Sequence, residues 1–272
     1  MELVDTQMAK TVNGAPVVLE FRHATLSFGG LRAIQDVSLH VGKGELVGLI
    51  GPNGAGKTTL FNMATGAYNP DSGEILFEGH NIAGMAPYRI NRLGIARTFQ
   101  NIRLWGQMTV LDNIRAAMHQ RVRTTLWQVV AAGSIHAEDE DRVLDEAREL
   151  LAYLDLTRVE QERAKNLPYG EQRRLEIARA LATQPTLILL DEPAAGMNTG
   201  EKIKLMDLIR RLQTERHLTV LLIEHDMKVV MGICERVAVL DHGEKIAEGR
   251  PEEIQRNPQV IEAYLGEAPP TS

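Results

Sequence analysis

Apolar segments interrupted by glycine dominate the first third of the chain. Residues 17–28 (VVLEFRHATLSF) and 35–50 (QDVSLHVGKGELVGLI) are rich in β-branched and other apolar side chains, which is typical of strands. Residues 73–82 (GEILFEGHNI) are expected to add a further strand in a hairpin. The amino-terminal part is therefore predicted to be rich in β-structure.

The centre of the chain changes to a helical period. Between residues 142 and 156, apolar side chains recur at spacings of three and four, at Val143, Ala147, Leu150 and Leu154. This spacing places them on one face of an α-helix. We expect a mostly helical insert at about residues 101–166.

After residue 166, helices and apolar strands alternate. A predicted helix at 171–183 precedes the apolar run TLILL (186–190), and LTVLLIE (218–224) follows a second predicted helix. Asn198, with Glu201 three residues later, resembles a capping box that starts this second helix. Short apolar runs between helices are typical of a buried parallel sheet, so the fold class is predicted to be α/β.

The carboxyl-terminal part is predicted to hold a hairpin and two short helices. Residues 236–249 (RVAVLDHGEKIAEG) have the pattern of a hairpin, and Pro251 and Pro258 each suit the first position of a helix. The tail, residues 267–272, is expected to be disordered.

Composition excludes several classes of protein. The chain has 272 residues, 44% hydrophobic and 24% charged, which is ordinary for a globular protein and allows one large domain or two small ones. With Cys234 as its one cysteine, it has no intrachain disulfide, and a reducing compartment is expected. No apolar run reaches the roughly 18–20 residues of a membrane helix. The amino terminus lacks the pattern of a signal peptide.

Charge is distributed unevenly within a formal net charge of −6. Residues 81–127 carry seven arginines and one aspartate, whereas residues 137–165 carry ten acidic and five basic side chains. The net charge and a pI near 5.8 disfavour broad binding to nucleic acid. The two stretches are interpreted either as separate functional faces or simply as solvated surfaces.

One motif predicts a phosphate-binding loop. The segment GPNGAGKTT matches G-x4-G-K-[ST] and lies between the strand-like ELVGLI and a helix-compatible stretch, TLFNMATGA. Its glycines leave backbone N–H groups available to phosphate oxygens, the lysine reaches the β- and γ-phosphates, and the first threonine offers its hydroxyl to Mg²⁺. The alternative is a chance glycine-rich turn. The residues of the loop are Gly51, Pro52, Asn53, Gly54, Ala55, Gly56, Lys57, Thr58 and Thr59.

A second motif places two carboxylates at the end of a predicted buried strand. Asp191 and Glu192 follow LILL, where consecutive acids are costly unless they serve a purpose. Together with a phosphate loop upstream, Asp191 is predicted to hold Mg²⁺ and Glu192 to act as a general base on an attacking water. Alone, the pair would be interpreted as solvated acids at a strand end.

Three further segments narrow the type of phosphate-loop protein. These are RTFQN, which contains Gln100, NLPYGEQRRLEIARAL (166–181) and LLIEHDM, which contains His225. Their order resembles that of the ATP-binding-cassette (ABC) ATPases over about residues 17–266. This resemblance implies an ABC fold with a RecA-like core, an antiparallel β subdomain and a helical subdomain at about 101–166.

The resemblance also implies roles for single residues. Gln100 corresponds to the Q-loop glutamine, which contacts the γ-phosphate side and Mg²⁺, and His225 to the switch histidine. Residues 195–198 correspond to the D-loop. The basic stretch at 81–127 brackets Gln100, so the resemblance places this stretch where the family docks its membrane subunits, near an anionic leaflet. Phe28 corresponds to the aromatic that stacks on adenine, although a core phenylalanine is an equal alternative.

The signature stretch, residues 167–171, departs from the commonest family form, LSGGQ. Here it is LPYGE, with Pro168 in place of the serine, Tyr169 in place of the first glycine and Glu171 in place of the glutamine. In family dimers this stretch reaches the nucleotide of the other subunit. Tyr169 and Gly170 are therefore candidate nucleotide-binding residues, whereas Pro168 has neither a hydroxyl nor an N–H to offer.

The sequence around these motifs resembles the longer ATPase subunit of high-affinity branched-chain amino acid importers. This implies ATP and Mg²⁺ as cofactors, with transport driven by ATP hydrolysis from the cytoplasmic face of the inner membrane. The implied partners are two multispanning permease subunits, a second and different ATPase subunit and, indirectly, a periplasmic or lipoprotein receptor, but no nucleic acid. The alternatives are an importer for another small solute and a soluble ABC ATPase acting on ribosomes or DNA.

Overall fold

The computed structural model describes residues 11–12, 15–118 and 135–265, with no account of side chains at 11–12 and 135–139. The tail at 267–272 and two arginines of the basic stretch, Arg121 and Arg123, lie outside the described residues.

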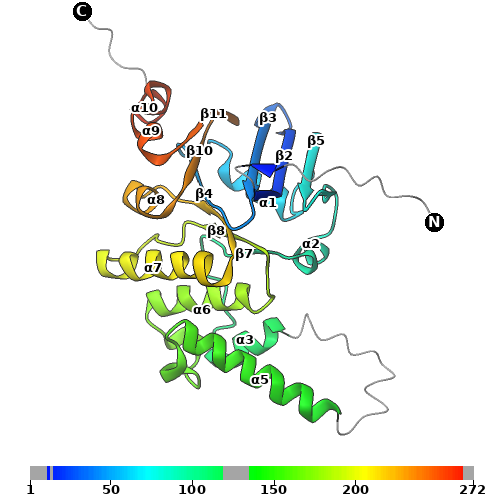
Figure 1. The fold of residues 1–272 in the computed structure, drawn as a ribbon, viewed down its shortest axis with the longest axis vertical. Coiled ribbons are helices and arrows are strands. Elements are labelled where there is room, and N and C mark those ends of the chain that lie inside the picture. The colour runs from blue at the N-terminus through cyan, green and yellow to red at the C-terminus, as the bar shows by residue number, and fades with distance from the viewer. Residues whose placement is uncertain (1–10, 13–14, 119–134, 266–272) are drawn as a thin grey trace, which may run out of the picture.

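An antiparallel sheet forms from the amino-terminal strands. β2 (Ala15–Phe28) pairs with both β3 (Leu31–Gly42) and β5 (Ser72–Phe77), and these pairings confirm the predicted strands. Two short strands, β1 (Thr11–Val12) and β6 (His80–Asn81), extend the sheet. Figure 1 shows this sheet next to α1.

A second, mostly parallel sheet has the order β11-β10-β4-β9-β8-β7 within the described residues. Its strands are β4 (Leu46–Ile50), β7 (Ile95–Arg97), β8 (Leu187–Asp191), β9 (Thr219–Ile223), β10 (Arg236–Asp241) and β11 (Glu244–Gly249). β10 and β11 form the predicted antiparallel hairpin, and the other neighbours are parallel. Because the carboxyl ends of parallel strands share one edge, residues after β4, β8 and β9 converge there.

The described residues also form helices. They are α1 (Lys57–Ala64), α2 (Pro87–Leu93), α3 (Val110–Met118), α5 (Ile135–Tyr153), α6 (Tyr169–Leu181), α7 (Thr199–Arg216), α8 (Met227–Ile233), α9 (Pro251–Gln255) and α10 (Pro258–Leu265), with single 3₁₀ turns at Thr157–Val159 and Ala164–Asn166. The helix predicted at 142–156 is α5, which starts earlier and ends at Tyr153. Figure 1 shows α3 and α5 at the opposite end of the molecule from α9 and α10.

Local sequence signals set several helix ends. Asn198 accepts the N–H of Glu201, and Glu201 accepts the N–H of Asn198, so the predicted capping box starts α7. Pro251 and Pro258 are the first residues of α9 and α10, as predicted.

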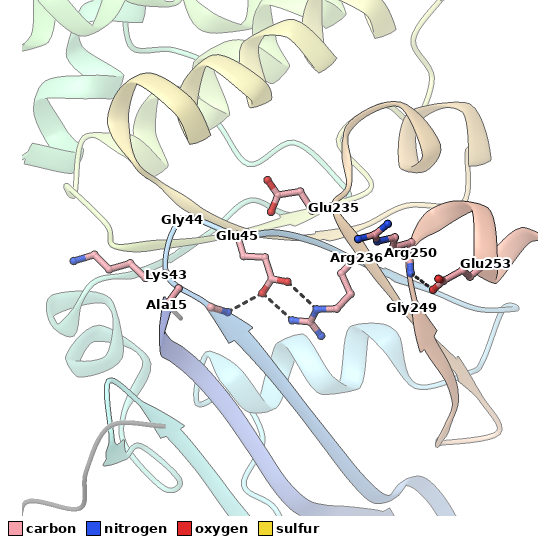
Figure 2. A pocket seen from close by; sticks show the side chains of 10 residues that line it. Ala15, Lys43, Gly44, Glu45, Glu235, Arg236, Gly249, Arg250 and Glu253 are labelled. Atoms are coloured by element: carbon pink, nitrogen blue, oxygen red, sulfur yellow. Dashed lines mark hydrogen bonds and ion pairs between the residues drawn. The ribbon is translucent and has the colours of Figure 1, made fainter. Parts of the chain in front are cut away.

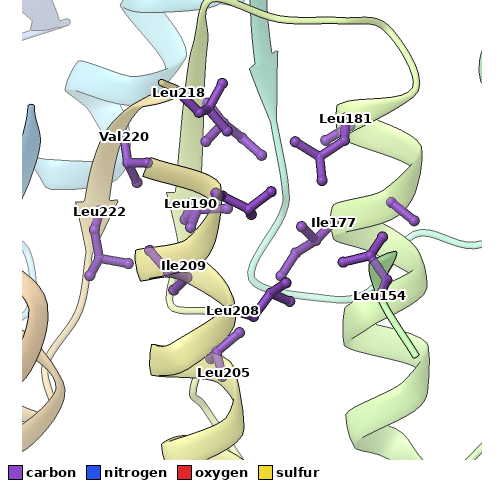
Figure 3. Packing of buried hydrophobic residues seen from close by; sticks show 14 of the residues in the cluster. Leu154, Ile177, Leu181, Leu190, Leu205, Leu208, Ile209, Leu218, Val220 and Leu222 are labelled. Atoms are coloured by element: carbon purple, nitrogen blue, oxygen red, sulfur yellow. The ribbon is translucent and has the colours of Figure 1, made fainter. Parts of the chain in front are cut away.

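The core has two halves, one on each face of the parallel sheet. On one face, Leu190, Val220 and Leu222 pack with helices of the carboxyl-terminal half, including Leu208 and Ile209 of α7, as Figure 3 shows. On the other face, alternate residues of the same strands pack with α1 and the antiparallel sheet. Both faces are thus buried, which is why the strands are continuously apolar.

Among the described residues, no helix is long and apolar enough to cross a membrane.

Candidate nucleotide-binding site

The glycine-rich loop connects β4 directly to α1. Gly51 has φ 148°, and a Cβ there would lie 2.0 Å from the carbonyl oxygen of Leu240. Gly56 has φ 102° and caps α1, and a Cβ there would lie 2.6 Å from the carbonyl oxygen of Ala33. Both positions therefore require glycine. The loop carries backbone N–H groups to the helix amino terminus, which is a favourable place for phosphate.

Lys57 is folded back onto its own loop. Its Nζ donates to the carbonyl oxygens of Gly51, at 2.7 Å, and Pro52, at 2.8 Å. Burial lowers the pKa of this ammonium, and the nearby carboxylates of Glu192 and Asp191 oppose the shift. The ammonium group thus lies at the loop, with two carboxylates close enough to influence it.

Asp191 is the last residue of β8 and is 3% exposed. Its Oδ2 accepts a hydrogen bond from Nη2 of Arg97, at 2.7 Å, and Arg97 Nη1 donates to Asn62 Oδ1, at 2.6 Å. Arg97 ends β7, next to β8 in the sheet, so the two strand ends bring guanidinium and carboxylate together. A buried carboxylate requires such a partner.

Glu192 is held in a strained conformation directly after β8. Its φ is 46°, in the left-handed region that residues other than glycine rarely adopt, and its N–H donates to the carbonyl oxygen of Ile223. Gln100 Nε2 donates to Glu192 Oε2 at 2.8 Å, and His225 Nδ1 lies 3.5 Å from the same oxygen. The side chains of Gln100 and His225, from two separate segments, thus meet at the Glu192 carboxylate.

A buried carboxylate supports the backbone around these groups. Glu224, 1% exposed, accepts N–H groups of Ala194, His225 and Asp226 at 2.8, 3.2 and 3.3 Å. Burial raises the pKa of the Glu224 carboxyl, and these hydrogen bonds oppose the shift. Glu224 therefore ties the turn after Glu192 to the segment that carries His225.

A cavity of about 580 Å³ lies over the loop, and most of the predicted residues line it. Its lining includes Phe28, Asn53, Gly54, Ala55, Gly56, Lys57, Thr58, Thr59, Gln100 and Glu192. Phe28 is 46% exposed, so it is not the core phenylalanine of the alternative interpretation, and its ring centroid lies 5.1 Å from that of Tyr68 in an edge-to-face contact. The volume of the cavity and the glycine-rich loop at its base suit a nucleoside triphosphate.

The family described as ABC transporter matches residues 34–195, which is more than half of the chain. The chain belongs to the ABC transporter family. A second family, described as branched-chain amino acid ATP-binding cassette transporter, matches residues 244–269. The high-affinity branched-chain amino acid transport ATP-binding protein LivG of Salmonella typhimurium is 47% identical over 243 residues, 89% of this chain and 95% of that protein.

Solved structures of ABC cassettes share the fold. A nucleotide-free ATP-binding cassette from an ABC transporter superposes with a TM-score of 0.80, with 33% identity and coverage of 92% of this chain and 100% of the other. A dimeric cassette in a post-hydrolysis state, bound to ADP and phosphate, gives 0.72, 26% identity and coverage of 86% and 98%. The chain is therefore an ATP-binding transport ATPase with the predicted ABC fold.

Within this ABC ATPase, Tyr169 and Gly170 do not line the cavity over the phosphate loop. They begin α6, and Gly170 lines a smaller hollow of about 190 Å³ with Pro168 and residues of α7. The structure of one chain thus separates the signature stretch from its own phosphate loop.

A second large cavity, about 620 Å³, lies at the opposite end of β4 and is drawn in Figure 2. Two partly buried charges in its lining are paired with each other, because Arg236 donates to both carboxylate oxygens of Glu45 at 2.7 and 2.8 Å. Glu45 also accepts the N–H of Gly42. We interpret the pair of Glu45 and Arg236 as structural, because it joins the start of β4 to β10 and to the antiparallel sheet.

The structure corrects one interpretation of the basic stretch at 81–127. Arg97 is not on a solvated or membrane-facing surface, because its side chain is 7% exposed and binds Asp191. Sequence reasoning missed its place in the site, and missed Glu224 and Arg173, because their partners are distant in sequence. The one available signal for Arg97 was its position in a strand-like segment three residues before Gln100.

Proposed function

We propose that this chain is the ATP-hydrolysing subunit of a membrane importer for branched-chain amino acids. The observation that carries the hydrolytic part is the meeting of Gln100 and His225 at the Glu192 carboxylate, beside the phosphate loop. The likeness to LivG and the match at residues 244–269 support the amino acid substrate. The ATPase subunit itself does not bind the transported solute in this proposal.

ATP is proposed to occupy the cavity over the loop, with its adenine against Phe28 and its phosphates on the backbone of residues 51–59. Mg²⁺ would be held by Thr58, Gln100 and Asp191, which offer the hydroxyl, amide and carboxylate oxygens that this ion prefers. The donor set fits, since Thr58 and Gln100 line the same cavity and Asp191 directly precedes Glu192, which also lines it. Bound Mg²⁺ would neutralise charge on the phosphates.

Each side chain then has a distinct task in hydrolysis. Lys57, now bonded to loop carbonyls, would turn to the β- and γ-phosphates. Glu192 would accept a proton from the attacking water, because this residue lines the cavity and Gln100 and His225 lie at its carboxylate. The side-chain amide of Gln100 would orient the Glu192 carboxylate, and His225 would contact the γ-phosphate.

The complete site is proposed to need a second cassette. Tyr169 and Gly170 would contact the nucleotide of a different ATPase subunit, and the phosphate loop here would receive that subunit's signature stretch. Residues 17–266 are proposed to form this nucleotide-binding domain, with a helical subdomain at about 101–166. Two multispanning permease subunits would hold the pair at the cytoplasmic face of the inner membrane, with a periplasmic or lipoprotein receptor delivering substrate.

The test is ATP turnover and leucine uptake by the complete transporter in proteoliposomes. We expect Glu192→Gln to abolish turnover while ATP binding is retained, because the amide cannot accept the proton. Glu235→Gln, an exposed carboxylate beside the second cavity, is the matched control and should hydrolyse ATP normally. Normal turnover by Glu192→Gln would overturn the hydrolytic assignment. Normal uptake of leucine, isoleucine and valine in a deletion strain would overturn the substrate assignment.

A further inference from the structure

Arg173, on α6, connects segments that are far apart in the sequence. Its side chain is fully buried, with 0% exposed. Nη1 donates to the carbonyl oxygen of Phe99 and to Glu176 Oε2, both at 2.7 Å. Nη2 donates to the carbonyl oxygen of Gln100, at 2.8 Å, and to the hydroxyl of Tyr169, at 3.2 Å. One guanidinium therefore joins the Q-loop backbone to the signature tyrosine.

Glu176 strengthens the connection from the same helix. Its Oε1 accepts the N–H groups of Phe99, at 3.2 Å, and Arg103, at 3.3 Å. Together, Arg173 and Glu176 bind both carbonyl and N–H groups of the segment 99–103. A buried ion pair with planar, directional donors has few alternative arrangements, so it fixes the position of this segment relative to α6.

Tyr169 adds a contact to the turn after Glu192. A Cβ built on Gly196, which has φ 73°, would lie 3.6 Å from Cε1 and Cζ of the Tyr169 ring. The ring therefore packs against this turn, while 42% of the residue remains exposed. A glycine at position 169, as in the commonest family form, could make neither the ring contact nor the bond to Arg173. Tyr169 therefore connects Arg173 to the turn after Glu192, which the glycine of the commonest family form would not do.

We infer that Arg173 is a positioning residue that couples the exposed Tyr169 to Gln100 in the same chain. A ligand or partner surface that displaces the tyrosine hydroxyl removes one hydrogen bond from a fully buried guanidinium. Arg173 then shifts relative to the carbonyl oxygens of Phe99 and Gln100, and the Gln100 amide moves relative to Glu192. This inference rests on the proposed function, because Gln100 has a task only where ATP is hydrolysed.

The test is a double-mutant cycle in the complete transporter. Tyr169→Phe keeps the ring and removes only the hydroxyl, and Arg173→Lys keeps the charge but loses the fork of donors. Loss of one hydrogen bond predicts that Tyr169→Phe lowers kcat about 2- to 10-fold. In Arg173→Lys, which keeps the tyrosine, the ATP dissociation constant should stay unchanged. Arg173→Lys should lower kcat further, and the double variant should be no slower than Arg173→Lys alone.

Arg174→Lys is the matched control on the same helix. Arg174 faces Asp155, Glu171 and the carbonyl oxygen of Leu154, and makes none of the Q-loop contacts. Its kcat should equal that of the wild type, and thermal melting should confirm that all variants fold. Hydrogen exchange at residues 99–103 should increase in Arg173→Lys and not in Arg174→Lys.

Two results would overturn the inference while leaving the proposed function intact. One is an unchanged kcat for Tyr169→Phe, and the other is full additivity of the two substitutions in an active transporter. Failure of the proposed function would be seen differently, as a wild-type complex without ATPase activity or as a Glu192→Gln variant that still turns over.

Discussion

Arg97 and Asp191 form a buried ion pair, with 2.7 Å between Nη2 and Oδ2 and side chains that are 7% and 4% exposed. The guanidinium also lies over the rings of Phe61 and Phe99, at 5.5 and 5.1 Å from their centroids. The carboxylate that we propose for Mg²⁺ is therefore neutralised by a fixed internal cation. Under the proposed function, this guanidinium would share the carboxylate with Mg²⁺.

Arg97→Met is expected to destabilise the protein by about 3–5 kcal/mol, because it leaves the Asp191 carboxylate buried without its partner. The measurement is urea unfolding at neutral pH. The double variant Arg97→Met/Asp191→Asn removes both charges and should recover part of the loss. If Arg97→Met lowered the free energy of unfolding by less than about 1 kcal/mol, Arg97 would not be the main partner of Asp191.

Lys57→Ala is expected to weaken ATP binding about 10- to 100-fold, the range for the loss of one charge-assisted contact. Isothermal titration with ATP on the purified chain measures this directly. Lys43→Ala removes the same charge beside the second cavity and should bind ATP as the wild type does. Equal weakening in both variants would indicate a general effect of charge, without a special role for Lys57.

Glu224→Gln is expected to change the pH dependence of stability. Burial raises the pKa of Glu224 above its ordinary 4.5, so the folded protein binds this proton more tightly than the unfolded chain does. The stabilisation is fully present below about pH 4.5 and is lost as pH rises through the folded-state pKa. The free energy of unfolding of the wild type, relative to Glu224→Gln, should therefore fall as pH rises from about 4.5 towards neutrality.

Urea unfolding of both proteins across this pH range is the measurement. Glu235→Gln, an exposed carboxylate, controls for the loss of one negative charge. A constant difference between the wild type and Glu224→Gln across the range would contradict the prediction.

Local patterns were sufficient for most of the fold. The strand and helix on either side of the glycine-rich motif, the capping box at Asn198 and the terminal hairpin were each predicted from a few adjacent residues, and the structure confirms these elements. The continuous apolar runs predicted strands buried on both faces, and β8 and β9 are fully buried. The interpretation of the whole basic stretch at 81–127 as an exposed surface was wrong for Arg97, because composition does not report which way a side chain at a strand end points.

The sequence by itself determined the class of fold, the phosphate loop and the two carboxylates, since each depends on spacing within one short segment. Only the tertiary structure decided that Gln100, 92 residues from Glu192, donates to its carboxylate, and that Arg97 binds Asp191. It also decided that Arg173 joins Tyr169 to the Q-loop. The physical reason is that such contacts depend on strand order and helix packing. These bring together residues that are far apart in the sequence, and a local sequence pattern does not specify such contacts.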